Sequence, residues 1–345
     1  MDPYQVDLIN SRDANSGAEK ALIDALWPMA KDLRFEKHDW IPFSTYYVNQ
    51  YEHSLQNQGQ NIAVRKHGHI IDLCRLLLKN TTREQIRDRL LDGSIGFRAS
   101  TTQVADNTID LAARICFMVN VGSSVATITP GRTQLQWRDG EPRTFLRDRF
   151  TPQQMLSGVY VRFERTFTAR SIDCIAGIRI RWTDNLADHL RMLDPDDKTI
   201  AVFHHASFLK RQQNDLFPGG FIEEMRRTLT LLFPQHDRVL QTWLQTQKKQ
   251  YTIDGQLAEN GQLRLDERQL NNFRFWHDRL VILKQAYDES RPATLSQWWH
   301  DRRNSVQWYT FWVAIIVLFL TIFFGMVQSI EGALQVYKAY HPTVV

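Results

Sequence analysis

Apolar residues recur at helical spacing through the first third of the chain. Their three- and four-residue steps predict helices over 62–78, 81–92 and 102–119. A Thr-x-x-Glu capping box begins at Thr81 and precedes the second of these helices, and Gly93 follows it as a typical stop. We therefore predict a loose N-terminus over 1–15 and a helical region over 16–122. The aromatic-rich stretch 40–60 has no clear period, so we assign it no structure.

The spacing of apolar residues changes after residue 122. Alternation of apolar and polar residues predicts half-buried strands near 159–163 and 178–182, and a short apolar run predicts an interior strand at 199–203. An Asp-Gly pair between two apolar stretches predicts a hairpin over 135–145. Helical spacing then returns in three segments, at 220–234, 239–244 and 266–288. We expect the glycine-containing stretch 251–265 to be a surface excursion.

A continuous apolar run dominates the C-terminal part. It reads WYTFWVAIIVLFLTIFFGMV from Trp308 to Val327, within an uncharged stretch over 305–330. Twenty residues rise about 30 Å as a helix, which matches the hydrocarbon core of a bilayer. A buried helix of a soluble core is the alternative, but core helices seldom run this far without a polar face. The predicted anchor positions are Trp308, Trp312, Ile316, Leu320, Phe324 and Val327.

These segments define the predicted organisation of the chain. Residues 123–290 form an α+β region, 291–305 a juxtamembrane linker, 306–330 a transmembrane helix and 331–345 a short tail. The fold class is α+β, because a run of helices precedes a run of strands. We expect a helical N-terminal layer, a small mostly antiparallel sheet, further helices and one C-terminal transmembrane helix.

Charge and cysteine usage indicate on which side of the membrane the residues before the apolar run are expected to lie. The 42 Lys and Arg against 38 Asp and Glu give a net charge of only +4, evenly mixed, which argues against nucleic acid as a partner. The N-terminus has no apolar core of a signal peptide, and the 3 cysteines are far apart. Arg302 and Arg303 precede the span, whereas Lys338 is the one base after it, so the positive-inside rule predicts a cytosolic N-terminal part. We expect a tail-anchored protein whose partner is the lipid bilayer.

Candidate chemistry centres on two adjacent histidines. His204 and His205 follow the predicted strand 199–203, and functional groups often lie at strand ends. Adjacent side chains of an extended chain point to opposite sides, so we expect the two imidazoles not to share a metal, with one in the core and the other solvated. No metal or cofactor is predicted, since the common phosphate-binding, hydrolase and metal motifs are missing.

Three further residues could carry chemistry. Cys174 beside Asp173 could act as a nucleophile, although its apolar neighbours favour a buried thiol. Asp184 could flank His189 as an acid–base pair, although acids at the start of a helix are usually caps.

Several blocks of the sequence resemble a known group of proteins. They are IRWTDNLADHL at 180–190, AVFHHASFL at 201–209, LFPGGFIEEMRRTLTLLFP at 216–234 and the anchor with its flanks from 298 to 340. Together they resemble an uncharacterised family of single-pass proteins of filamentous ascomycete fungi. The resemblance implies a fungal membrane protein and carries no activity or functional residue with it.

Three functions remain open from the sequence. The first is an interaction or regulatory module held at a membrane and binding a protein partner, because an anchor accompanies a chain without catalytic motifs. The second is an enzyme of an unrecognised family with a site near His204 and His205. The third is an accessory subunit of a membrane complex.

Overall fold

The computed structural model describes most of the chain outside the N-terminus and several connecting segments. The described residues are 23, 24, 26, 27, 40–55, 59–122, 133–152, 154–156, 161–194, 198–212, 215–290 and 305–340. The chain divides into two compact units, Met1–Glu289 and Ser290–Val345. The first unit combines helices with a small sheet, which confirms the α+β class.

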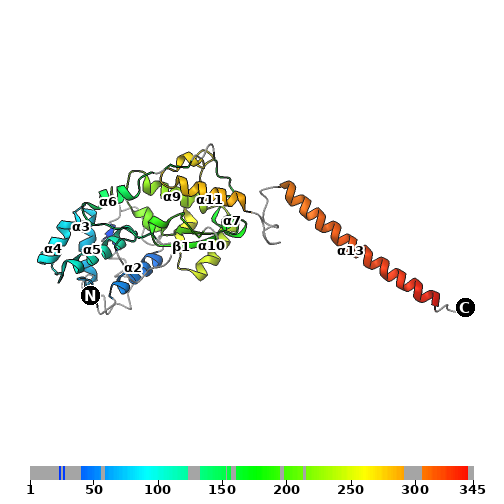
Figure 1. Cartoon of the computed structure of the whole chain (residues 1–345), viewed down its shortest axis with the longest axis horizontal. Helices are drawn as coiled ribbons and strands as arrows, with labels where there is room; N and C mark the ends of the chain where they lie inside the picture. Colours follow the sequence, from blue (N-terminus) through cyan, green and yellow to red (C-terminus); the bar gives the residue numbers. More distant parts are fainter. Residues whose placement is uncertain are drawn as a thin grey trace. The chain divides into compact units, whose positions relative to one another are not determined.

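The predicted helical region is built around one helix. α5 (Thr102–Phe117) is buried on most of its surface, and α2 (Ile41–Ser54), α3 (His67–Leu78) and α4 (Arg83–Asp92) pack against it. These helices gather at one end of the first unit (Figure 1). Thr101 caps α5 by accepting a hydrogen bond from the Val104 N–H, and Met118 ends it in a left-handed conformation. The helices expected at 62–78, 81–92 and 102–119 are thereby confirmed, the first of them beginning at His67.

Two details of this region differ from expectation. α2 lies where no structure was assigned, because its buried face consists of Phe43 and the tyrosines 46, 47 and 51 rather than aliphatic residues. The cap of α4 is Thr82, which accepts from the Gln85 N–H, so the expected capping box is shifted by one residue. The Glu84 carboxylate accepts instead from the Gly140 N–H at 2.8 Å and ties α4 to a distant loop.

The sheet has three strands in the order β1-β3-β2. β1 (Arg179–Thr183) and β3 (Thr199–Phe203) confirm the strands expected near 178–182 and at 199–203. They pair in parallel, Arg179 opposite Thr199 and Thr183 opposite Phe203, whereas the short β2 (Met192–Asp194) pairs antiparallel to β3. The sheet is therefore mixed rather than mostly antiparallel, because the chain passes from β1 to the far edge before β3 enters the middle.

Three local predictions differ from what the described residues form. The hairpin expected over 135–145 is replaced by α6 (Pro142–Arg149), since proline suits the first turn of a helix. Near 159–163 the described part, from 161 onward, forms only an isolated bridge between Arg162 and Gln269. The stretch 251–265 is a surface excursion only in part, because Ile253 and Leu257 are buried around the 3₁₀ helix η5 (Gly255–Glu259).

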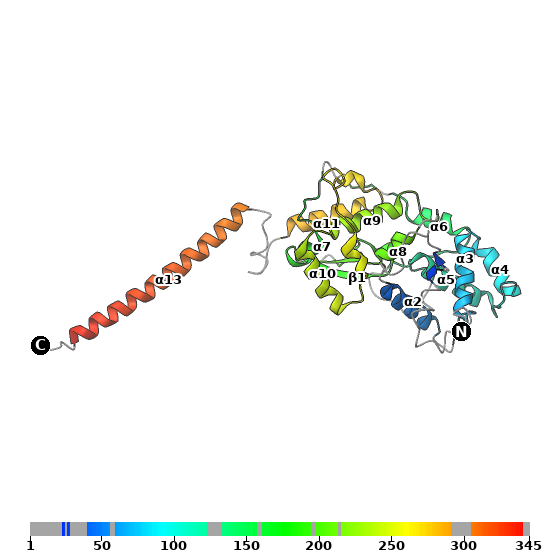
Figure 2. The same ribbon diagram turned by 180° about the vertical axis from the view of Figure 1, so that it is seen from behind.

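The remaining elements surround the sheet. They are α7 (Ala169–Cys174), the 3₁₀ helix η4 (Leu186–Asp188), α8 (Ala206–Arg211), α9 (Phe221–Leu232), α10 (Arg238–Gln250), the 3₁₀ helix η6 (Leu270–Asn272) and α11 (His277–Glu289). Both views place α7, α10 and α11 near β1, at the end of the unit away from α4 (Figures 1 and 2). α9 and α10 match the predicted helices. The long helix expected over 266–288 begins only at His277, because η6 interrupts it.

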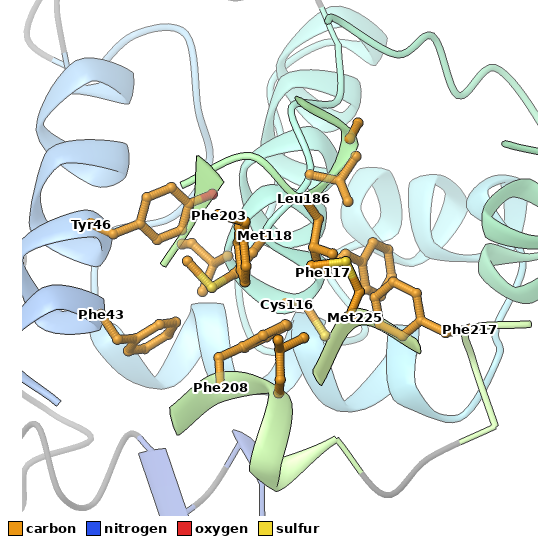
Figure 3. Close-up of a cluster of buried hydrophobic side chains, with 14 of the residues drawn as sticks. Phe43, Tyr46, Cys116, Phe117, Met118, Leu186, Phe203, Phe208, Phe217 and Met225 are labelled. Carbon is orange, nitrogen blue, oxygen red and sulfur yellow. The ribbon is translucent and has the colours of Figure 1, made fainter. Parts of the chain in front are cut away.

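One hydrophobic core joins the helical region to the α+β region. Figure 3 shows Phe117 and Met118 from the end of α5 beside Phe203 from β3 and Leu186 from η4. Phe208 of α8 lies in the same cluster, and all of these side chains are buried. Residues on both sides of position 122 therefore share one core.

The second unit contains the long helix α13 (Ser305–Tyr340) of 36 residues. Its stretch Trp308–Tyr337 is long and apolar enough to cross a membrane, and its most apolar window has no buried residue. The six predicted anchor positions all lie on this helix. The helix continues past the expected bound at 330, so most of the expected tail is helical. Arg302 and Arg303 lie outside the described residues.

Candidate functional site

The ends of the two parallel strands place three polar side chains together. Asp184 directly follows β1, and His204 and His205 directly follow β3. Because β1 and β3 run in parallel with Thr183 opposite Phe203, their carboxyl ends lie side by side. The carboxyl ends of parallel strands are a common position for ligand-binding groups.

The two imidazoles converge on a single carboxylate oxygen. His204 Nε2 lies 3.2 Å and His205 Nε2 2.7 Å from Asp184 Oδ1. The rings stack with centroids 4.0 Å apart and an interplanar angle of 29°. Our expectation that adjacent side chains would diverge is wrong at this place. The chain leaves the extended conformation at His205, with φ −80° and ψ 72°, as α8 begins.

Burial of the three side chains is unequal. The side chains of His204 and His205 are 6% and 2% exposed, whereas that of Asp184 is 45% exposed. The expectation that one histidine would be solvated is therefore wrong. Aromatic rings enclose the pair, with Trp182 edge-on to His204 and Tyr46 edge-on to His205. The site is thus a buried imidazole pair that meets solvent through a carboxylate.

Electrostatics set the charge states of Asp184 and His205. Burial and the neighbouring His204 lower the pKa of His205 to about 4, although Asp184 acts in the opposite direction. Burial opposes ionisation of Asp184, but hydrogen bonds from both histidines outweigh it and hold the pKa of Asp184 well below its usual range. At neutral pH the site therefore presents a carboxylate and a neutral His205 imidazole.

A buried aspartate holds the turn that directs the histidines. Asp254 accepts hydrogen bonds from the Ser207 N–H at 2.6 Å and from Ser207 Oγ at 3.0 Å. Burial raises the pKa of Asp254 to about 6, against its hydrogen bonds to Ser207 and Gln256. These bonds fix the start of α8 directly after His205. Sequence reasoning missed Asp254, because it acts across 47 residues of chain.

His189 belongs to the core and not to the cluster. Its Nε2 lies 2.8 Å from Thr228 Oγ1, and its Nδ1 accepts from the Phe203 N–H at 3.3 Å. Burial and the Arg279 cation lower the pKa of His189 to about 3. The pairing of Asp184 with His189 that the sequence suggested is not formed, since Asp184 binds the other two histidines.

Cys174 differs from its expected state. It is exposed, whereas Cys74 and Cys116 are buried. Desolvation of the thiol and the adjacent Asp173 carboxylate raise the pKa of Cys174, which disfavours the reactive thiolate. Its Sγ lies 4.0 Å from Asp173 Oδ2, and a carboxylate at that position does not activate a nucleophile.

The arrangement permits two kinds of chemistry. An imidazole paired with a carboxylate can move a proton as a general acid or base. Two imidazole nitrogens and one carboxylate oxygen can also serve as ligands, and here one such atom from each residue lies within 4.8 Å of the others. Comparisons with protein families, with curated proteins and with solved structures found no match to this chain.

Proposed function

We propose that this chain is a single-pass membrane protein whose α+β unit is an interaction or regulatory module on the cytosolic face. The observation that carries the proposal is the 30-residue stretch Trp308–Tyr337, whose most apolar window has no buried residue. Apolar surface of this extent is unfavourable in water and is stabilised within hydrocarbon. Its helical backbone satisfies its own hydrogen bonds, as a bilayer requires.

Side chains at the start of α13 suit the membrane interface. Trp308 and Trp312 lie one turn apart with ring centroids 6.2 Å from each other. Tryptophan favours the headgroup region, because its ring is apolar and its N–H polar. Further along, Thr321 Oγ1 donates to the Val317 carbonyl at 2.8 Å, which satisfies this hydroxyl within the helix. The tryptophan pair supports a span that begins near Trp308, and the bonded hydroxyl of Thr321 is compatible with hydrocarbon around it.

The orientation rests on charge. Arg302 and Arg303 precede the span and Lys338 follows it. More basic residues lie on the side of the α+β unit, which supports a cytosolic location of that unit. The resemblance of residues 180–190, 201–209 and 216–234 to single-pass proteins of filamentous ascomycetes supports the same layout, and we propose membership of that family.

The near absence of charged residues from the span favours an interaction role over transport. Within Trp308–Tyr337 the charged residue is Glu331, near one end, so the membrane part offers no path for ions or polar solutes on its own. The anchor then serves to hold the α+β unit near a membrane-bound partner. Such confinement raises the effective concentration of the unit for that partner.

Native mass spectrometry of the full chain, gently extracted in detergent, tests the interaction role. A second polypeptide at fixed stoichiometry is expected, and cross-links to residues of the α+β unit would assign it to a cytosolic module. Cross-links confined to α13 would indicate an accessory subunit instead. A lone chain after extraction, and after cross-linking in intact membranes, would contradict the proposal.

The second candidate is an enzyme with its site at Asp184, His204 and His205. The convergence of both imidazoles on one oxygen, at 3.2 and 2.7 Å, is the observation that favours it. Asp184→Asn removes the negative charge while preserving the shape. An enzyme would lose turnover in this variant and keep its partner, whereas loss of the partner alone would favour the interaction module.

A further inference from the structure

The hydrogen bonding of the histidine pair is not what stability alone would favour. His204 and His205 share one acceptor, Asp184 Oδ1, through their Nε2 atoms. His204 Nδ1 is buried and has no hydrogen-bond partner within the described part of the chain. A buried polar atom without a partner is uncommon in native proteins. Because Nδ1 is not one of the converging atoms, the case for a ligand rests on the approach of the two Nε2 atoms to one carboxylate oxygen. By contrast, both ring nitrogens of the buried His189 are bonded.

From this geometry we propose that Asp184, His204 and His205 bind one divalent transition-metal ion, with zinc as the best-matched class. Zinc binds histidine nitrogens and carboxylate oxygens at about 2.0–2.2 Å, which places ligand atoms roughly 3 Å apart. The Asp184 Oδ1 atom already lies 3.2 and 2.7 Å from the two Nε2 atoms. The spacing of these atoms is therefore close to that of ligand atoms around one ion.

The proton balance of binding is simple. In the neutral imidazole that donates to Asp184, the proton is on Nε2 and Nδ1 has a free lone pair. When Nε2 binds the ion, the proton moves to Nδ1 and the imidazole stays neutral. The ion replaces two hydrogen bonds to one carboxylate oxygen with bonds to all three residues.

The donor set selects the class of ion. Two nitrogens and one oxygen suit zinc and other divalent ions of intermediate softness, such as cobalt and ferrous iron. Calcium and magnesium prefer oxygen ligands throughout, and cuprous copper prefers sulfur. No cysteine belongs to this cluster. Zinc is the first choice, because it accepts low coordination numbers without a preferred d-electron geometry.

The supports of the three ligands are rigid. Asp184 and the histidines extend two hydrogen-bonded strands, in which Trp182 pairs with Val202. Aromatic rings of Trp182 and Tyr46 contact the imidazoles and limit their rotation. Preorganised ligands of this kind bind metal more tightly than ligands on mobile loops.

Unequal burial of the ligands sets the access to the ion. Asp184 is 45% exposed, whereas the imidazoles are almost fully buried. An ion arriving from solvent therefore meets the carboxylate first and then the two nitrogens. Three protein ligands leave a fourth position for water or another ligand, as in catalytic rather than structural zinc sites. The metal site is independent of the interaction role proposed above.

The test uses the full chain in detergent, freed of metal with a chelator, and Zn²⁺ as the probe in isothermal titration. We expect about one ion per chain and a rise in melting temperature, because a ligand of the folded state stabilises it. Asp184→Asn should weaken binding at least about 100-fold and abolish the rise, while the matched control His236→Ala, an exposed imidazole elsewhere, should bind as the wild type does.

A second readout separates ligation from folding. Co²⁺ in place of Zn²⁺ gives visible absorption bands that change with its ligands, and these should appear in the wild type and in His236→Ala but not in Asp184→Asn. The rise in melting temperature on adding Zn²⁺ is compared within each protein, because Asp184→Asn also changes the acceptor of two histidine hydrogen bonds in the metal-free fold. Equal binding of Zn²⁺ by all three proteins, or no saturable binding by the wild type, would overturn the proposal.

Discussion

The two units of this chain use the same apolar residues in opposite ways. In the α+β unit, Phe203 and Leu229 are 0% exposed, whereas in α13 Phe319 is 67% and Leu320 44% exposed. The first unit hides its apolar surface from water by folding around one core. α13 has no buried residue in its most apolar window and is long and apolar enough to cross a membrane. The contrast separates residues that stabilise the fold from residues that place it at a membrane.

The largest expected effect is on membrane association. Ile316→Arg combined with Leu320→Arg places two charges in the middle of the span, each of which costs about 2.5–3.5 kcal/mol at the centre of a transmembrane helix. We expect the protein to move from the carbonate-resistant membrane fraction to the soluble fraction. The melting temperature of the α+β unit should remain unchanged, since α13 forms a separate unit.

A matched control uses an exposed apolar residue of the first unit. Val239 and Ile316 are both 55% exposed, so Val239→Arg changes a similarly exposed apolar side chain. It should leave both membrane association and stability as they are. Equal loss of membrane association in both variants would contradict the assignment of α13 as the anchor.

The next largest effect is on the core. Phe203→Ala removes a fully buried ring at the end of β3 and should destabilise the first unit by about 3–5 kcal/mol, measured by chemical unfolding. Val239→Ala is the control and should cost less than about 0.5 kcal/mol. Membrane association should be unaffected in both variants. A small effect of Phe203→Ala would contradict the shared core of Figure 3.

Much of this architecture follows from local patterns. The period of apolar residues predicts α3 and α5, a continuous apolar run predicts α13, and alternation predicts β1. α2 was missed because its buried face is aromatic and interspersed with asparagine and glutamine. α6 was mistaken for a strand, because the segment 142–149 is too short for helical spacing to be distinguished from alternation.

The candidate site was less predictable than the fold. His204 and His205 were identified from their place after a strand, but their convergence depends on the turn at the start of α8. That turn is held by Asp254, which belongs to a distant segment. The approach of Asp184 depends on the parallel pairing of β1 with β3, and no local pattern distinguishes parallel from antiparallel partners here.

A smaller effect concerns pH. The pKa of His189 falls from its ordinary value of 6.5 to about 3 in the fold. Between pH 6.5 and about pH 3 the unfolded chain therefore binds a proton at this residue that the folded chain does not bind. Stability from the neutral His189 is therefore present above pH 6.5 and lost as the pH falls. At pH 5 the loss is about 2 kcal/mol relative to neutral pH.

Substitution of the same residue isolates this contribution. His189→Gln keeps a polar group facing Thr228 but cannot titrate. The difference in unfolding free energy between wild type and variant should shrink by about 2 kcal/mol from pH 7 to pH 5. An unchanged difference would show that His189 does not stay neutral in the fold.

The smallest effect is on a helix cap. Thr82 Oγ1 accepts from the Gln85 N–H and begins α4. Thr82→Ala should destabilise the first unit by about 1 kcal/mol. Thr81→Ala serves as the control, because Thr82 holds the cap position in the structure, and it should have little effect. The reverse order would favour the capping box expected from the sequence.

The central claim is that α13 crosses a bilayer, and the accessibility of its two ends tests it most directly. In a Cys174→Ser background, which removes the exposed native thiol, single cysteines replace Ser305 or Tyr340 at the ends of the helix. A membrane-impermeant maleimide is then added to sealed vesicles with the cytosolic face outward. We predict labelling at position 305 at once and at position 340 only after permeabilisation. Labelling of both positions in sealed vesicles would contradict a span.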